Sequence, residues 1–135
     1  MPTSAKRVLL AAALAAVLAA GLPAQIAPPD PAPLLGQWLL EVNAGEIYFL
    51  PFELKLVEGK LTGSLSEQSG MFTNVPITAV VWDGTTLKFE AKIPTPPDGS
   101  ERPVKVEFKL DKGKLVGGFT IEELGLVAPT TGTKK

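Results

Sequence analysis

The chain of 135 residues has room for one domain, and it contains neither cysteine nor histidine. These absences exclude disulfides, thiolate metal sites, a cysteine nucleophile and the Ser-His-Asp and Cys-His catalytic arrangements. The formal net charge is −1, without the concentrated basic surface that nucleic-acid binding requires, so we expect no nucleic-acid partner.

Residues 1–24 have the three parts of a secretory signal peptide. Lys6 and Arg7 give a positive start, a 13-residue apolar run follows at 8–20, and small residues lead to a cleavage site that we place after Ala24. As a helix the run would be about 20 Å long, which is short for a hydrocarbon core of about 30 Å. We expect export from a bacterial cell to the periplasm or the medium, with no membrane span after cleavage. The alternative is an uncleaved membrane anchor.

Residues 25–34 are rich in proline, which fixes φ and lacks a backbone donor. This composition predicts an extended tether of polyproline II character. The folded domain is then expected to cover residues 35–135.

Apolar and polar residues alternate along most of residues 35–135, as in strands with one buried and one solvated face. We expect strands at 37–42, 52–56, 61–66, 75–81, 87–93, 104–110, 115–121 and 126–133. Turn signals such as Asp83-Gly84 separate them. Two longer connections, 67–74 and 94–103, remain, and the prolines of the second predict an exposed loop.

These elements predict an all-β domain, a single antiparallel meander that closes into a roughly eight-stranded β-barrel. Closure removes the exposed strand edges that a free meander would leave open to aggregation. The alternative is a two-sheet β-sandwich, in which the 94–103 loop would carry a crossover.

Two short motifs resemble those of calycin-like barrels. Gly36-Gln37-Trp38 is similar to the G-x-W that opens lipocalins and avidin-like proteins, and residues 59–64 look like the second hairpin of avidin-like proteins. The whole also resembles small secreted bacterial domains without an assigned activity. In lipocalins the opening Trp packs under a basic side chain from a late strand, and here only Lys134 or Lys135 is available. Avidin-like sites use several Trp residues, whereas this chain has 2, so biotin binding is not implied.

Four aromatic residues are candidate ligand-binding residues: Trp38, Tyr48, Phe52 and Trp82. Trp38 lies on the apolar parity of its strand and either plugs one barrel end or stacks on a ligand. Tyr48 and Phe52 belong to residues 47–52, which are apolar on both parities and form a partner surface, a ligand mouth, a face covered by the tether or a locally buried strand. Trp82 has the opposite parity to its strand and is expected on the outer face or rim.

The inward positions include four small residues, Gly63, Ala79, Ala91 and Gly117, which either leave a cavity or offset the bulk of the inward aromatic side chains. No charged residue is expected to point inward, so a ligand would be apolar.

The acidic residues alternate outward, and no Gly-rich phosphate loop precedes a helix, so we expect no enzyme, no cofactor and no metal site. The sequence therefore predicts an exported, non-enzymatic barrel that binds a small apolar ligand. The alternative is a protein-interaction or envelope-structural module, such as a secreted protease inhibitor. The oligomeric state is left open.

Overall fold

The structure, a computed structural model, describes residues 29–135. The predicted signal peptide at residues 1–24 lies outside the described part and stays a prediction. Among residues 29–135, no helix has the length and apolar character needed to cross a membrane. The elements in chain order are the 3-10 helix η2 (Ala32–Leu34), β1 (Gly36–Asn43), β2 (Ile47–Val57), β3 (Lys60–Leu65), β4 (Val75–Pro76), β5 (Thr78–Trp82), β6 (Thr86–Thr95), β7 (Ser100–Asp111), β8 (Lys114–Ile121), the 3-10 helix η3 (Glu122–Leu124) and β9 (Leu126–Lys134).

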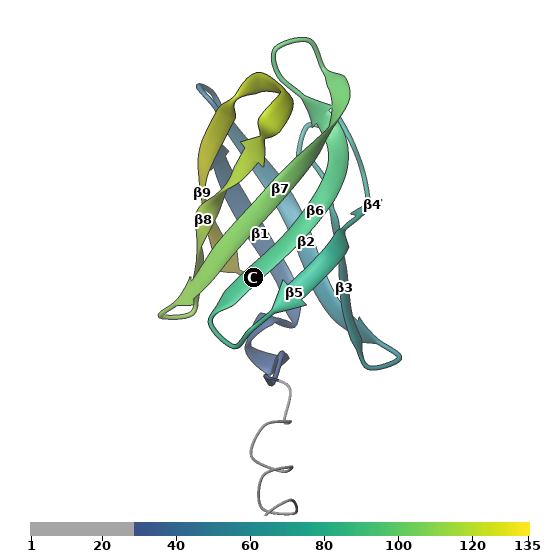
Figure 1. The fold of residues 1–135 in the computed structure, drawn as a ribbon, viewed down its shortest axis with the longest axis vertical. Coiled ribbons are helices and arrows are strands. Elements are labelled where there is room, and N and C mark those ends of the chain that lie inside the picture. The colour runs from purple at the N-terminus through teal and green to yellow at the C-terminus, as the bar shows by residue number, and fades with distance from the viewer. Residues whose placement is uncertain (1–28) are drawn as a thin grey trace, which may run out of the picture.

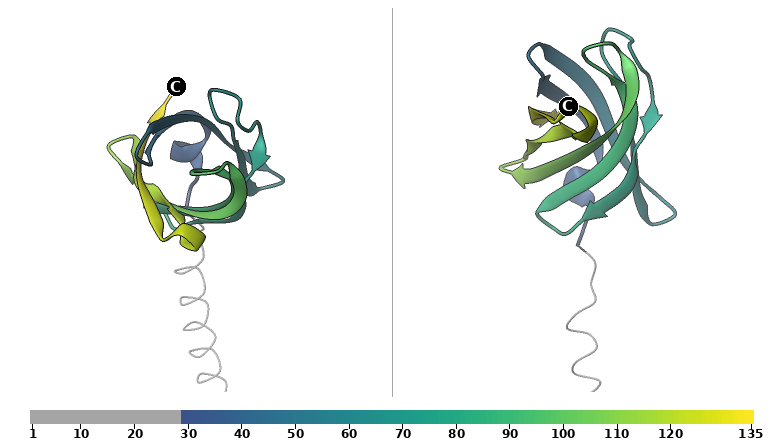
Figure 2. Two further views of the ribbon diagram at one scale, coloured as in Figure 1. Left: turned by 90° about the horizontal axis from the view of Figure 1, so that it is seen from above. Right: turned by 45° about the horizontal axis from the view of Figure 1, so that its top comes forward.

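The 9 strands form one antiparallel sheet in the order β4-β3-β2-β1-β9-β8-β7-β6-β5. Sequential strands pair as hairpins, and the first strand also pairs with the last, so the sheet curls into a nearly closed barrel (Figure 1). The predicted antiparallel meander and its closure are confirmed, in place of the two-sheet sandwich. Figure 2 shows the ring of strands when the barrel is viewed from above.

The two edges of this sheet meet at a seam, which the chain itself crosses. β4 pairs with β3 and β5 pairs with β6, and these two short strands are separated only by Ile77. The amide of Ile77 donates a hydrogen bond to the carbonyl of Gly63, 3.0 Å away. The predicted strand at 75–81 is therefore two strands on opposite sides of the seam, which gives nine strands where eight were expected.

A bulge in β5 reverses the inward and outward positions that the alternation predicts. Ala79 has a φ of 52°, and the register with β6 shifts between Thr78 and Val81. An extra residue in one strand shifts every later side chain to the other face. Ala79 and Val81 are consequently exposed, Val81 by 57%, while Trp82 packs against the core. The predicted inward position of Ala79 is wrong. Of the two positions expected for Trp82, the outer face or the rim, it occupies the rim.

The predicted loop at 94–103 is also wrong, because β6 continues to Thr95 and β7 begins at Ser100. Pro94 pairs with Glu101, and Pro103 pairs with Lys92. At these positions each strand has only one neighbour: β6 has passed the end of its pairing with β5, and β7 has not yet begun its pairing with β8. A strand with one free side tolerates proline, since no ladder donor is needed there.

Aromatic side chains fill the middle of the barrel. The ring centroids of Phe52 and Phe89 are 5.2 Å apart, those of Phe89 and Phe108 6.2 Å, and those of Phe108 and Phe119 6.3 Å, which are separations typical of favourable aromatic pairs. A Cβ atom on Gly117, which is paired with Phe108, would overlap the backbone oxygen of Glu107. Glycine at position 117 therefore allows the backbones of β7 and β8 to pack closely. The rings of the aromatic row fill the centre of the barrel.

Candidate binding site at the open end of the barrel

One end of the barrel, here called the closed end, is covered by η2 and by the indole ring of Trp38. Trp38 is buried, and its Nε1 donates a hydrogen bond of 2.8 Å to the carbonyl oxygen of Leu34, the buried last residue of η2. The Nζ of Lys134 on β9 lies 5.5 Å from the centroid of the Trp38 ring and donates a hydrogen bond of 3.2 Å to the carbonyl oxygen of Pro33. The first and last strands thus close this end together.

The second tryptophan also lies at the closed end. The Nε1 of Trp82 donates a hydrogen bond of 3.2 Å to the carbonyl oxygen of Asp30. The last residues of the Pro-rich stretch, for which an extended tether was expected, therefore contact the barrel, and Ala32–Leu34 forms a helical turn there.

The opposite end, here called the open end, is formed by four connections together with the strand ends that flank them, at residues 43–47, 66–74, 94–102 and 121–126. A pocket with a volume of about 50 Å³ opens between them. Its lining is almost entirely apolar and comes from Val42, Ala44, Tyr48, Leu50, Glu67, Met71, Phe72, Ile93, Pro94, Thr95, Pro96, Val104, Phe119, Ile121 and Ala128. Phe119, the last ring of the aromatic row, separates this pocket from the filled centre.

Glu67 is the one ionisable acid among the residues that line the pocket, and its side chain is 8% exposed. Its carboxylate accepts a hydrogen bond of 2.6 Å from the Ser69 hydroxyl and another from the Ser69 backbone amide. The hydroxyl bond is the main cause that lowers the pKa of Glu67, so the group is ionised at neutral pH. The expectation that no charged residue points inward is wrong, because Glu67 comes from a loop and follows no strand alternation.

Tyr48 brings a phenol to the same pocket. Its hydroxyl donates a hydrogen bond of 3.3 Å to Oε2 of Glu46. Burial, followed by the negative charge of Glu46, raises the pKa of Tyr48 above its ordinary value, so the phenol stays protonated. The pocket surface is therefore apolar, while the hydroxyl of Tyr48 and the carboxylate of Glu67 are engaged in hydrogen bonds.

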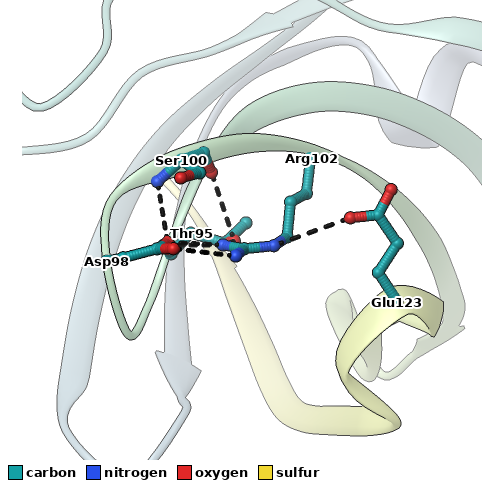
Figure 3. Close-up of polar contacts among 5 residues, drawn as sticks. All are labelled: Thr95, Asp98, Ser100, Arg102 and Glu123. Atoms are coloured by element: carbon teal, nitrogen blue, oxygen red, sulfur yellow. Dashed lines mark hydrogen bonds and ion pairs between the residues drawn. The ribbon is translucent and has the colours of Figure 1, made fainter.

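A cluster around Arg102 fixes one side of the open end (Figure 3). The Nη1 of Arg102 donates hydrogen bonds of 2.8 Å to Oδ1 of Asp98 and 2.9 Å to Oγ1 of Thr95, and its Nε lies 3.6 Å from Oε2 of Glu123 in η3. The hydrogen bond to Arg102 is the main cause that holds the pKa of Asp98 well below its ordinary value. Since Thr95 lines the pocket, this cluster links the β6–β7 turn to η3 beside the pocket.

The four candidate residues do not come together in the structure. Tyr48 lines the open-end pocket, Phe52 belongs to the aromatic row, and Trp38 and Trp82 lie at the closed end. The plug role of Trp38 agrees with its hydrogen bond to η2. Whether any of the four binds a ligand stays a prediction.

Sequence reasoning missed the loop residues of the pocket. Glu67, Met71 and Phe72 lie in a connection without periodicity, and Thr95 lies in the stretch taken for an exposed loop. The signal for this part of the pocket was the pair Met71 and Phe72, two apolar residues in an otherwise polar loop, of which Phe72 is 8% exposed.

Among residues 29–135, no three acidic side chains are arranged to hold a metal ion. Every buried side-chain nitrogen or oxygen in that range has a hydrogen-bond partner. The polar groups of the described interior are thus satisfied without a bound ion.

Comparisons of the chain with protein-family models, with curated proteins and with solved structures give no match.

Proposed function

We propose that this protein is an exported, non-enzymatic binding protein that takes the apolar end of a small molecule into the open-end pocket. The observation that carries the proposal is a pocket with almost entirely apolar lining at the barrel end that η2 leaves uncovered. Pockets that enclose a whole drug-sized ligand have volumes of about 300–1,000 Å³. A volume of about 50 Å³ suits only a few carbon atoms, so the rest of the ligand would lie outside the pocket.

A relationship to lipocalin-like barrels is part of this proposal. Lys134, a basic residue of the last strand, lies over the ring of Trp38, which is the arrangement that the resemblance implies. The barrel closed at one end supports the same interpretation.

The absence of catalysis and the export are proposed from the sequence. The chain lacks histidine and cysteine, and residues 1–24 have the pattern of a signal peptide. The mass of the protein purified from its source tests the export: we expect the loss of 24 residues, and a full-length cellular protein would contradict it.

Titration with octan-1-ol tests the pocket. We expect saturable changes in the amide NMR signals of Val42, Phe72 and Ile121, and a loss of about tenfold in affinity for Ala128→Leu, because excluding two methylene groups costs roughly 1.6 kcal/mol. Ala128 lines the pocket, whereas its neighbour Val127 is 64% exposed, so Val127→Leu is the matched control and should bind normally.

Ala44→Leu, at the rim of the pocket, replaces Ala128→Leu if that variant does not fold. The proposed pocket is wrong if octan-1-ol causes no saturable change, or if both filled variants bind it as well as the parent protein does.

A protein-interaction role is the second candidate, favoured by the outer face of β2. Ile47 and Phe49 alternate there and are 49% and 38% exposed. Exposed apolar neighbours on one strand are typical of contact surfaces. Native mass spectrometry of the protein from its source distinguishes the two roles: a bound small molecule supports the first, and a stoichiometric protein that Phe49→Ser releases supports the second.

A further inference from the structure

The two ends of the barrel carry different charge. The four connections of the open end and their flanking strand ends hold six acidic residues and one basic residue: Glu46, Glu67, Asp98, Glu101, Glu122, Glu123 and Arg102. The turns and chain ends of the closed end hold four acidic and five basic residues: Asp30, Glu58, Asp83, Asp111, Lys60, Lys112, Lys114, Lys134 and Lys135. A molecule that approaches the pocket therefore meets a negative field.

Part of this negative charge is neutralised within the protein, and the part next to Tyr48 is not. Arg102 forms ion pairs with Asp98 and Glu123. Lys105 pairs with Glu122 at 2.8 Å. None of the ion pairs within residues 29–135 includes Glu46 or Glu67.

The two carboxylates that form no ion pair both act on the Tyr48 hydroxyl. Glu46 accepts the hydrogen bond from the Tyr48 hydroxyl, and the charge of Glu67 also acts on that hydroxyl. The donors that the carboxylate of Glu67 already uses come from its own loop and carry no formal charge. A carboxylate has about four lone-pair positions, and the Ser69 hydroxyl with the backbone amides of Ser69, Gly70 and Met71 already uses those of Glu67. Glu67 therefore acts on a ligand through its charge, whereas Glu46, which accepts from the Tyr48 hydroxyl, has room for a further donor.

We infer that the ligand of the open-end pocket is a cationic amphiphile, with its apolar tail in the pocket and its positive group at the rim beside Glu46 and Glu67. This inference rests on the proposed function and adds the chemical class of the ligand. A positive group pairs with carboxylates that otherwise have only water and neutral donors, whereas a negative group would be repelled by both. The complementarity of charge also distinguishes the open end from the closed end, where Lys134 and Lys135 lie.

Three ligands with the same eight-carbon chain test the inference: octylammonium, octan-1-ol and octanoate. Calorimetric titration at low ionic strength should give octylammonium an affinity about tenfold above that of octan-1-ol, and octanoate the weakest binding of the three. The preference should shrink as salt is added, because Glu46 is exposed to solvent and the Debye length falls from about 30 Å at 0.01 M to 3 Å at 1 M.

Charge-removing variants locate the effect. Glu46→Gln should reduce the preference for octylammonium over octan-1-ol several-fold and leave the affinity for octan-1-ol unchanged, because Glu46 does not line the pocket. Glu67 does line it, so the effect of Glu67→Gln is measured as the ratio of the two affinities, which should also fall several-fold. Glu58→Gln removes the same charge from an exposed turn at the closed end and should not change the preference. If Glu67→Gln does not fold, Glu46→Gln decides alone, since Glu46 lies in an exposed turn.

The outcomes separate the inference from the function on which it rests. Equal binding of all three ligands, or a preference that survives Glu46→Gln and Glu67→Gln, overturns the cationic ligand and leaves the apolar pocket intact. Failure of all three to bind overturns the pocket as well.

Discussion

The closed end and the open end of this barrel are built from different parts of the chain. At the closed end the groups in contact belong to regular elements: Trp38 on β1, Lys134 on β9 and Leu34 in η2. At the open end connections add to the strand ends: Ala44, Met71 and Pro96 line the pocket together with Glu67 and Phe72, which are held by bonds within one loop. The comparison indicates that stability is concentrated at the closed end, while the open end has a surface that can change without loss of the fold.

The most direct test of this difference in stability is to remove one large aromatic side chain at each end. Trp38→Ala should lower the free energy of unfolding by about 3–5 kcal/mol, because the strands around the cavity cannot collapse into it. Phe72→Ala should cost only about 1.5–3 kcal/mol, the burial term alone, because a loop can close over the space. Urea denaturation of both variants measures the difference. Equal losses of unfolding free energy in the two variants would show that the two ends contribute equally to stability.

The acid limb of the stability curve tests the carboxylate at the open end. The folded-state pKa of Glu67 lies below its ordinary value of 4.5. Its stabilising contribution is therefore complete above pH 4.5 and is lost as the pH falls through the folded-state pKa. Relative to Glu67→Gln, the parent protein should lose stability below pH 4.5, as followed by urea denaturation.

Ser69→Ala should remove much of this acid dependence, because the Ser69 hydroxyl is the main cause of the lowered pKa. An unchanged acid limb in both variants would mean that the loop is not held by this carboxylate.

The smallest expected effect is local and concerns the Arg102 cluster. Arg102→Met should speed amide hydrogen exchange of Gly99 and Ser100, because Asp98, which accepts from Ser100, loses its guanidinium partner. The global unfolding free energy should change little, because the carboxylates of Asp98 and Glu123 are more than half exposed and methionine keeps the apolar part of the Arg102 side chain, which is 13% exposed. Lys88→Met is the matched control: its ion pair with Glu107 is exposed on both sides and lies away from this turn. Faster exchange across the whole barrel would contradict a local role.

The strands could be predicted from the sequence where one face is buried and the other is exposed to solvent, because apolar and polar residues then alternate. Val104, Val106 and Phe108 on β7 alternate with lysine and glutamate, and their strand is where it was expected. Residue types could not predict the bulge at Ala79, because a single left-handed residue in β5 depends on how the chain crosses the seam. Pro94 and Pro103 led to the wrong prediction of a loop for a related reason. Whether a strand has one neighbour or two at a given residue depends on the whole sheet, which residue types do not show.

The candidate site could be predicted only in part. Tyr48 was found, because residues 47–52 are apolar on both parities and one of the faces has to be buried or used. Glu67 could not be found, since its burial depends on hydrogen bonds from Ser69 and not on any periodicity. Arg102 points inward only because β7 extends as far as Ser100.

The seam at Ile77 bears on how the barrel could be re-ordered along the chain. The two strands that face each other across the seam are consecutive in sequence, while β1 and β9, at opposite ends of the chain, are fully paired within the sheet. A circular permutant that starts at Thr78 and ends at Ile77, with Lys135 linked to Pro29, would have the same strand neighbours in simple linear order. Each pair of neighbouring strands would then also be consecutive in the chain. A chain with such short-range pairings has a low contact order, which favours faster folding.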